Sequence, residues 1–353
     1  MTCIYLRHPR PQALADGRTV HGCDIHELCT PQPHADGTAN PYAACPLCRD
    51  SLPADSRDLA ARYRDPLAVY TADKRPTDAL RGMLKGGVAF LVCGGPSAKQ
   101  LPLEQLQQPG CWSLAVNNMA AYYRPNAFVC SDPPSKFHEG IWRDPNIMKF
   151  VPEVKLHDRR GKLRRKQPDG SFADLKLTDE VATTQTVPNV WGFGRRSWFK
   201  PDDTFFTDPH AAWGNNDDGV RRTRGKKTVC TPLLGLRILY YLGARRVYLV
   251  GVDFYMDPAA GLHDNYAFKE ERDKGACESN NAQYAVVNEW LCLMQQNDVF
   301  SKFGLEVYNT NEASGLRAFA HVPFDVAVAD AWRDWPSGPP YDCKSWYHKP
   351  PRK

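Results

Sequence analysis

Between residues 86 and 330, short apolar runs alternate with helix-like segments. The run VAFLVC leads directly into Gly94, Gly95, Pro96 and Ser97, which is typical of a buried parallel strand that ends in a glycine turn. Further strands are predicted at WSLAVNN, AFVCSD, RVYLVGVDF and GLEVYNT. Helices are predicted at LPLEQLQQ, MAAYYRP, TPLLGLRILYYLG and AQYAVVNEWLCLMQQNDVFSKF. This order predicts an α/β fold with a Rossmann-like, mostly parallel, three-layer sheet.

Composition divides the chain into zones. Residues 1–52 are rich in Cys, His and Pro, and residues 53–85 are predicted to form a helical connector. The Rossmann-like domain is expected over 86–330, with an irregular insertion at about 138–220 where the periodicity is poor. Residues 331–353 are rich in Pro and aromatic side chains, so an extended tail is expected there.

The N-terminal zone contains the cysteine pattern C-x5-C, a spacer of 15 residues and C-x2-C. Thiolates in such pairs can share one tetrahedral zinc ion, which would supply folding energy to a zone too small for its own apolar core. The sequence therefore predicts a small zinc-binding module. Its ligands would be Cys23, Cys29, Cys45 and Cys48, with Cys3 or His26 as substitutes for one of them. The alternative is a set of unconnected free cysteines.

The glycine turn is a candidate phosphate site, because such a turn exposes backbone N–H groups at a helix start. It matches neither G-x-G-x-x-G nor a Walker loop. Asn117 and Asn118 close the second predicted strand, and Asp132 closes the third. Side chains at the carboxyl ends of parallel strands meet at one crevice, so a nucleotide site is predicted there. Alternatively, the two asparagines cap the helix that follows.

The chain resembles the sialyltransferase-like bacterial glycosyltransferases and their Rossmann-like relatives over about residues 86–328. The motifs that carry the resemblance are, in chain order, GGPS, LAVNN, VCSD and YLVGVDFY. The resemblance implies an inverting transfer from a nucleotide-sugar donor and no catalytic metal. A UDP-sugar is expected in preference to a CMP-sugar. The resemblance assigns donor binding to the glycine turn, the asparagine pair and a hydroxyl residue at a helix start. In this chain these are Gly94, Gly95, Pro96, Ser97, Asn117, Asn118 and Thr231.

An inverting transfer needs one base to take the proton of the acceptor hydroxyl. The family places a histidine at the start of the helix after G-[VI]-D-F-Y, but here that region reads ESNNAQYAVVNEWL. The nearest candidate is His263, backed by Asp264; Asp132 and Asp253 are alternative bases. His263 could equally be a surface loop residue.

The net charge is +5, and basic residues are dense in two clusters, RRGKLRRK (159–166) and RRTRGKK (221–227). Aromatic residues accompany these clusters: Trp191, Phe193, Trp198, Phe199 and Trp213. Basic side chains bind phosphates and aromatic rings stack on bases, although each cluster could also be a solvated loop. A zinc module beside this catalytic type also resembles the transferases with which phages decorate hydroxymethylated pyrimidines. The preferred acceptor is therefore a 5-hydroxymethylpyrimidine in DNA. Alternatives are a glycan or protein acceptor, or a non-catalytic zinc protein that binds nucleotide or nucleic acid.

Hydrophobic residues make up 42% of the chain and charged residues 24%, as in globular proteins. No apolar run approaches the roughly 20 residues that span a bilayer, and the N-terminus does not resemble a signal peptide. The expectation is a cytoplasmic protein without a membrane partner, in the host cytoplasm if a phage encodes it. Its cysteines would then be thiols or metal ligands. The sequence leaves the oligomeric state open.

Overall fold

The computed structural model describes residues 65–84, 86–107, 110–156, 187–198, 200–214, 230–268 and 270–333. It also describes the backbone of three antiparallel strand pairs. These are β1 (Arg10–Ala13) with β2 (Thr19–Gly22), β3 (Gln32–Pro33) with β4 (Ala39–Asn40), and β10 (Leu163–Lys166) with β11 (Phe172–Leu175).

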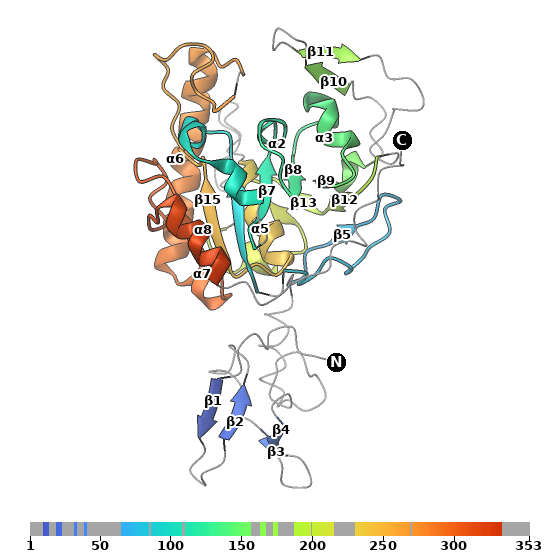
Figure 1. The fold of residues 1–353 in the computed structure, drawn as a ribbon, viewed down its shortest axis with the longest axis vertical. Helices are drawn as coiled ribbons and strands as arrows, with labels where there is room; N and C mark the ends of the chain where they lie inside the picture. The colour runs from blue at the N-terminus through green and yellow to red at the C-terminus, as the bar shows by residue number, and fades with distance from the viewer. Residues whose placement is uncertain are drawn as a thin grey trace.

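An eight-stranded sheet forms the centre of the fold, in the order β16-β15-β6-β7-β8-β9-β12-β5 (Figure 1). All neighbours are parallel except β5, which pairs antiparallel with β12 at one edge. The strands are β5 (Val69–Tyr70), β6 (Val88–Val92), β7 (Trp112–Val116), β8 (Ala127–Val129), β9 (Met148–Pro152), β12 (Val190–Phe193), β15 (Arg246–Val250) and β16 (Glu306–Asn309). The predicted α/β class and the mostly parallel sheet are confirmed.

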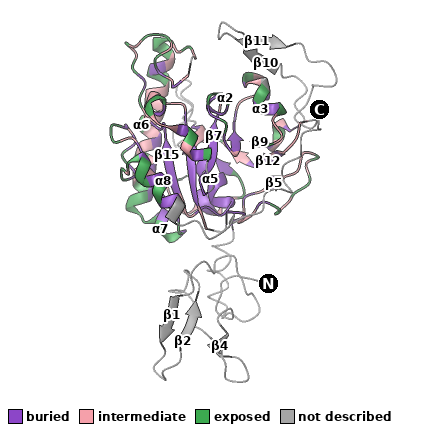
Figure 2. Ribbon diagram, viewed as in Figure 1, coloured by how far each residue is buried: buried purple, intermediate pink, exposed green. Residues whose placement is uncertain are grey.

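The central strands β6, β7, β8 and β9 are buried along their whole length because both faces of the sheet are covered (Figure 2). Along β6, Ala89 and Leu91 contribute to one apolar cluster, whereas Phe90 and Val92 contribute to the other. Helices α5 (Thr231–Tyr241), α6 (Lys274–Gln296) and α7 (Val299–Lys302) pack into the first cluster. The second contains η3 (Leu103–Gln107), α2 (Met119–Tyr122), α3 (Glu139–Arg143) and α8 (Phe324–Arg333). The result is three layers.

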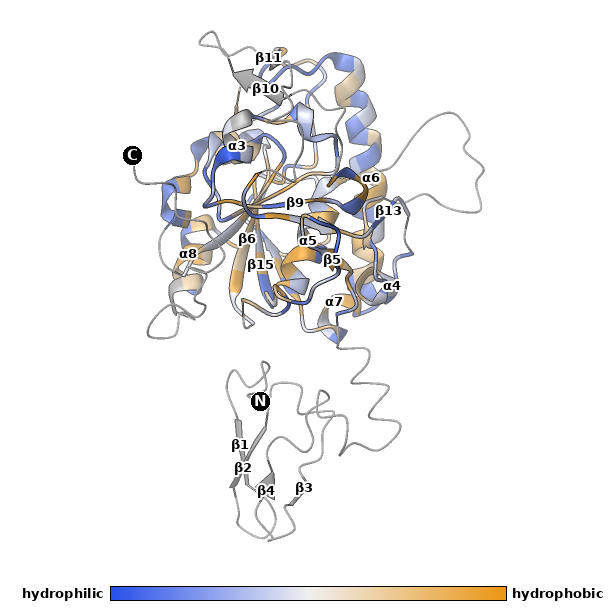
Figure 3. Cartoon of the chain, turned by 90° about the vertical axis from the view of Figure 1, so that its right-hand side faces the viewer, coloured by the Kyte–Doolittle hydropathy of each residue, from blue (hydrophilic) through white to orange (hydrophobic). Residues whose placement is uncertain are grey.

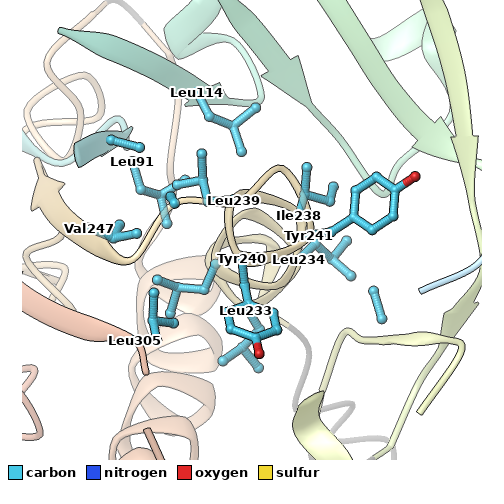
Figure 4. Packing of buried hydrophobic residues seen from close by; sticks show 14 of the residues in the cluster. Leu91, Leu114, Leu233, Leu234, Ile238, Leu239, Tyr240, Tyr241, Val247 and Leu305 are labelled. Carbon is cyan, nitrogen blue, oxygen red and sulfur yellow. The ribbon is translucent and has the colours of Figure 1, made fainter. Parts of the chain in front are cut away.

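Helix α5 is buried almost all round and is coloured mainly as hydrophobic in Figure 3. Its Leu239 lies near Leu91 of the sheet, as Figure 4 shows in a view along the helix. The helix ends at Tyr241, and Gly243 follows the cap residue Leu242 with a φ of +95°, which suits a glycine. Within this apolar surround, Arg237 is fully buried and donates to both carboxylate oxygens of Asp65, at 2.7 and 2.6 Å. The pair attaches α5 to the segment that leads into β5.

Two expectations about regular structure were wrong. Residues 65–84 of the predicted helical connector contain turns and the edge strand β5 rather than a helix. The predicted irregular insertion contains β9 and β12, which are strands of the main sheet. Lys149 concealed β9, because a lysine in a fully buried strand breaks the apolar pattern. Its Nζ donates to the carbonyl oxygens of Asp144, Ile147 and Pro188 at 2.5, 2.9 and 2.8 Å.

Helical expectations need smaller corrections. Within the segment LPLEQLQQ, Leu103–Gln107 forms the 3₁₀ helix η3 rather than an α-helix. The long predicted helix is two helices, because Asp298 adopts a left-handed conformation between α6 and α7, with φ of 56°. None of the helices in the described ranges is long and apolar enough to cross a membrane.

Candidate functional site

A pocket of about 220 Å³ opens at the carboxyl ends of β6, β7 and β15. From β6 the chain adds β7, β8, β9 and β12 on one side, then crosses to add β15 and β16 on the other. The boundary between β6 and β15 is therefore the topological switch point, where ligands bind in open α/β sheets. Four motif segments noted in the sequence contribute to its lining, through Gly94, Gly95, Asn117, Thr231 and Asp253.

Glycines allow the ends of β6 and β15 to approach closely. A Cβ at Gly95 would lie 2.5 Å from Oδ2 of Asp253 and 2.6 Å from the carbonyl oxygen of Gly251. Gly251 itself has φ of +65°, and a Cβ there would lie 2.3 Å from the carbonyl oxygen of Cys93. The glycines thus leave the space in which the chain segments after β6 and β15 pack against each other.

Hydrogen bonds lock the same junction. The Gly95 N–H donates to the Gly251 carbonyl at 2.9 Å, and the Ser97 N–H donates to Oδ2 of Asp253 at 2.9 Å. The Ser97 hydroxyl donates to Oδ1 of Asp253, which also accepts from Nδ2 of Asn311 at 2.7 Å. After the turn, Pro96–Gln100 forms only a short 3₁₀ helix, η2. Phosphate binding by the four turn residues stays a prediction, and of the four only Gly94 and Gly95 line the pocket.

Asn117 enters the pocket from the end of β7 in a left-handed conformation, with φ of 55°. Its Oδ1 is buried and accepts no hydrogen bond in the described structure. Asn118 is buried beside it and donates from Nδ2 to Oε2 of Glu270 at 3.1 Å. Although Asn118 stands at the start of α2, its side chain makes no capping hydrogen bond. An acceptor without a partner in a pocket wall is suited to a ligand donor.

Thr231 is the first residue of α5 and lines the pocket together with Cys230 and Pro232. Helix α5 is 11 residues long, so its N-terminus carries a partial positive charge toward the pocket. The Thr231 hydroxyl lies 3.4 Å from the hydroxyl of Ser131, which follows β8. Thr231 therefore connects the pocket to the neighbouring part of the sheet edge.

A wall that sequence reasoning missed comes from the loop after β15 and from α6. The loop contributes Asn265, Tyr266, Phe268, Glu270 and Arg272; the helix contributes Asn280, Gln283 and Tyr284. Two signals could have found them. Tyr266 and Phe268 alternate around a small residue, and the three helix residues are spaced i, i+3 and i+4, which places them on one face.

Ring stacking and ion pairing hold this wall. Tyr266 and Phe268 stack with centroids 5.3 Å apart, and Phe254 stacks on Tyr284 at 4.8 Å. Arg272 lies over the Tyr266 ring at 5.0 Å and bonds its hydroxyl at 3.1 Å. It also donates to Oε1 of Glu270 at 3.2 Å.

The charge on Arg272 is favoured by its surroundings. Burial opposes that charge, but Tyr266 and Glu270 outweigh it, so the pKa of Arg272 is raised. Burial raises the pKa of Tyr266, because it disfavours the charged phenolate. The wall thus presents a fixed guanidinium beside neutral phenol groups.

Of the residues predicted as candidate bases, only Asp253 lines the pocket. Its carboxylate, however, accepts three hydrogen bonds from Ser97 and Asn311. Asp132 follows β8 on the surface and pairs with Lys136 at 3.0 Å. His263 and Asp264 belong to the loop that carries the missed wall but do not line the pocket themselves. The Nδ1 atom of His263 is buried and has no hydrogen-bond partner in the described structure.

In the described part of the chain, the structure shows neither a reactive cysteine in the pocket nor a cluster of metal-ligating side chains. Burial raises the pKa of the Cys230 thiol to about 12 and that of Cys93 well above its usual range, so neither lining cysteine is an activated nucleophile. No three Cys, His, Asp or Glu side chains gather there as a metal site. The predicted zinc ligands Cys23, Cys29, Cys45 and Cys48, with Cys3 and His26, lie outside the described residues, as do Phe199 and the 221–227 cluster.

No protein-family model matches the chain, and no curated protein matches it. Among solved structures, the chain is weakly similar to the MAf glycosyltransferase from Magnetospirillum magneticum AMB-1, with a TM-score of 0.33 and 10% identity. The match covers 78% of this chain and 40% of that protein, so the chain spans two fifths of its length.

Proposed function

We propose that the chain is a glycosyltransferase that binds a nucleotide-sugar donor in the switch-point pocket. The observation that carries the proposal is the convergence of Gly94, Asn117, Thr231 and Asp253 on one pocket. These residues belong to segments by which the sequence resembles the sialyltransferase-like glycosyltransferases, and they are far apart in the chain.

The chemistry of the lining suits a nucleotide. The rings of Tyr266 and Phe268 offer apolar faces for a base or ribose, and Asn117 offers an unpartnered acceptor. Arg272 and the N-terminus of α5 offer positive charge to phosphates. A UDP-sugar is the preferred donor class and a CMP-sugar the alternative.

The proposed reaction inverts the anomeric carbon and needs no catalytic metal. The acceptor hydroxyl oxygen attacks that carbon, and the bond from the carbon to the donor phosphate oxygen breaks. The nucleotide leaves with the electron pair, and a base takes the hydroxyl proton. His263 is the proposed base, with Asp264 beside it in the chain; in the described structure its buried Nδ1 makes no hydrogen bond, to Asp264 or to any other residue. The three hydrogen bonds to Asp253 favour a positioning role for that carboxylate instead.

The test is a donor panel of UDP-, CMP-, GDP- and dTDP-sugars, with binding followed by calorimetry and turnover by release of free nucleotide. Acceptors are plain DNA, DNA containing 5-hydroxymethylpyrimidine, and a glycan. Donor-dependent nucleotide release with one acceptor supports the proposal, and the hydroxymethylated DNA is the expected one. Binding without turnover on any acceptor would instead identify a non-catalytic nucleotide-binding protein, and absence of all nucleotide binding would overturn the site assignment.

A further inference from the structure

The described lining of the pocket contains two carboxylates, those of Asp253 and Glu270. Asp253 is engaged in the three hydrogen bonds that lock the junction of β6 and β15. Glu270 accepts one hydrogen bond on each oxygen, from Nδ2 of Asn118 to Oε2 at 3.1 Å and from Nη2 of Arg272 to Oε1 at 3.2 Å. Because a carboxylate oxygen has two lone-pair sites, one acceptor site is left on each oxygen of Glu270.

The Glu270 carboxylate is held in one orientation from two sides. Asn118, which lies 152 residues earlier in the chain, is itself buried at the start of α2. Arg272 is fixed by two further hydrogen bonds, to the Tyr266 hydroxyl at 3.1 Å and to the Glu271 carbonyl at 3.0 Å. The Glu270 side chain still keeps 24% of its surface exposed, so a ligand in the pocket can reach it. A fixed, accessible acceptor loses little conformational entropy when a ligand binds.

A second acceptor belongs to the same part of the pocket. Asn117 lines the pocket and directly precedes Asn118, the residue that bonds Glu270. Its Oδ1 is buried and has no hydrogen-bond partner in the described structure. A buried acceptor without a partner is costly unless a ligand donates to it. This part of the wall therefore favours a ligand group that brings several hydrogen-bond donors.

Aromatic rings lie next to the Glu270 carboxylate. The guanidinium of Arg272 bonds both the Tyr266 hydroxyl and Glu270, so the phenol and the carboxylate are neighbours. The Tyr266 ring in turn stacks with Phe268 at a centroid distance of 5.3 Å, and both rings line the pocket. A nucleoside whose base lies against these rings would bring its ribose toward Glu270.

We infer that Glu270 accepts the 2′- and 3′-hydroxyls of the donor's ribose, so that the pocket selects ribonucleotides over deoxyribonucleotides. Two hydroxyls on adjacent carbons match one open acceptor site on each carboxylate oxygen. The uracil edge fits less well, because its single N–H lies between two carbonyl oxygens that a carboxylate repels. The inference rests on the part of the proposed function that places a nucleotide in the pocket, and it adds the residue that recognises the sugar of that nucleotide.

The test compares the affinities of UDP, 2′-deoxy-UDP and 3′-deoxy-UDP by calorimetry; if the donor panel selects a CMP-sugar, CMP and its two deoxy analogues replace them. The wild type should bind UDP about 10- to 100-fold more tightly than either analogue, the loss of one hydrogen bond to a charged group. This comparison needs no variant, so it does not depend on the folding of one.

Glu270→Gln should reduce the preference for UDP to about 1- to 3-fold, because the amide group replaces one of the two acceptors by a donor. The readout is the ratio of affinities, since a merely structural disturbance would weaken the three nucleotides equally. Glu271→Gln is the matched control, because Glu271 is the next acid in the chain, is exposed and does not line the pocket. It should keep the wild-type ratio. Melting temperatures establish that both variants are folded.

The outcomes separate this inference from the proposed function. Equal affinities of the wild type for UDP and its deoxy analogues overturn the inference and leave the proposed function intact. A full preference for UDP in Glu270→Gln, with or without a loss of turnover, also overturns it, and with a loss of turnover it identifies Glu270 as the base. Selection of UDP through Glu270 without transfer to any acceptor supports the inference, while the proposed function fails. Absence of all nucleotide binding overturns both.

Discussion

Asp253 at the end of β15 accepts hydrogen bonds from both the backbone N–H and the hydroxyl of Ser97, which lies 156 residues earlier in the turn after β6. A third bond, from Asn311 after β16, completes the clamp. The three segments belong to adjacent strands of the sheet. The clamp therefore sets the width of the cleft between β6 and β15, where the pocket lies.

Replacing Asp253 with Ala should lower the free energy of unfolding by about 1–3 kcal/mol, because the Ser97 and Asn311 donors lose their acceptor. Donor affinity should fall as well, since the cleft widens. Chemical denaturation and calorimetry measure the two effects. Glu312→Gln, which changes an exposed acid next to Asn311, is the control. Asp253→Asn with normal stability and donor affinity but a collapsed kcat would instead show that Asp253 is the base.

Asn117→Gly should weaken nucleotide binding about 3- to 10-fold, the loss of roughly one hydrogen bond. Glycine keeps the left-handed backbone at this position, so stability should change little. Asn189→Gly is the matched control, because Asn189 has the same φ of 55° but bonds the Pro145 carbonyl and does not line the pocket. Equal nucleotide affinities of wild type and Asn117→Gly would remove Asn117 from the site.

His263→Ala should lower kcat by about 10²- to 10⁴-fold if His263 is the general base. Donor affinity should stay unchanged, because His263 does not line the pocket. His321→Ala, at an exposed position before α8, is the comparison. A wild-type kcat for His263→Ala would refute the assignment and leave the base to Asp132 or Asp253.

Burial lowers the pKa of Lys149 to about 7, and Asp144 offsets part of this. In the unfolded chain the pKa is about 10.4, so between these values the unfolded state binds more protons. The contribution of Lys149 to the free energy of unfolding should therefore rise with pH from about 7 to about 10, by up to about 1.4 kcal/mol per unit, and should be constant below pH 7. Lys149→Met should lose this slope, and exposed Lys99→Met should retain it. Parallel curves for wild type and Lys149→Met would contradict the prediction.

The purified chain should contain about one equivalent of zinc, as four thiolates imply. Cys45→Ser should lose most of the metal, whereas Cys292→Ser, on α6, should keep it. Metal analysis by mass spectrometry measures both. Less than about half an equivalent in the wild type would exclude a stoichiometric zinc site.

The central strands and the place of the pocket could be predicted from the sequence because their signals are local. VAFLV and RVYLV are continuous apolar runs, and Gly94 and Gly95 follow the first directly. Strands β9 and β12 were missed because Lys149 and Gly192 interrupt their apolar pattern. Lys149 is tolerated only because three carbonyls, one from a segment near residue 188, surround its ammonium group.

The sequence by itself determined the α/β class, the positions of most strands along the chain and the segments that end at the pocket, because periodicity and glycine turns act over a few residues. Only the tertiary structure decided what those residues contact. It paired Ser97 with Asp253, formed one wall from Tyr266, Arg272 and α6, and brought Asn118 to Glu270. Such contacts join positions far apart in the chain, and their partners are set by strand order and crossover, which local residue patterns do not encode.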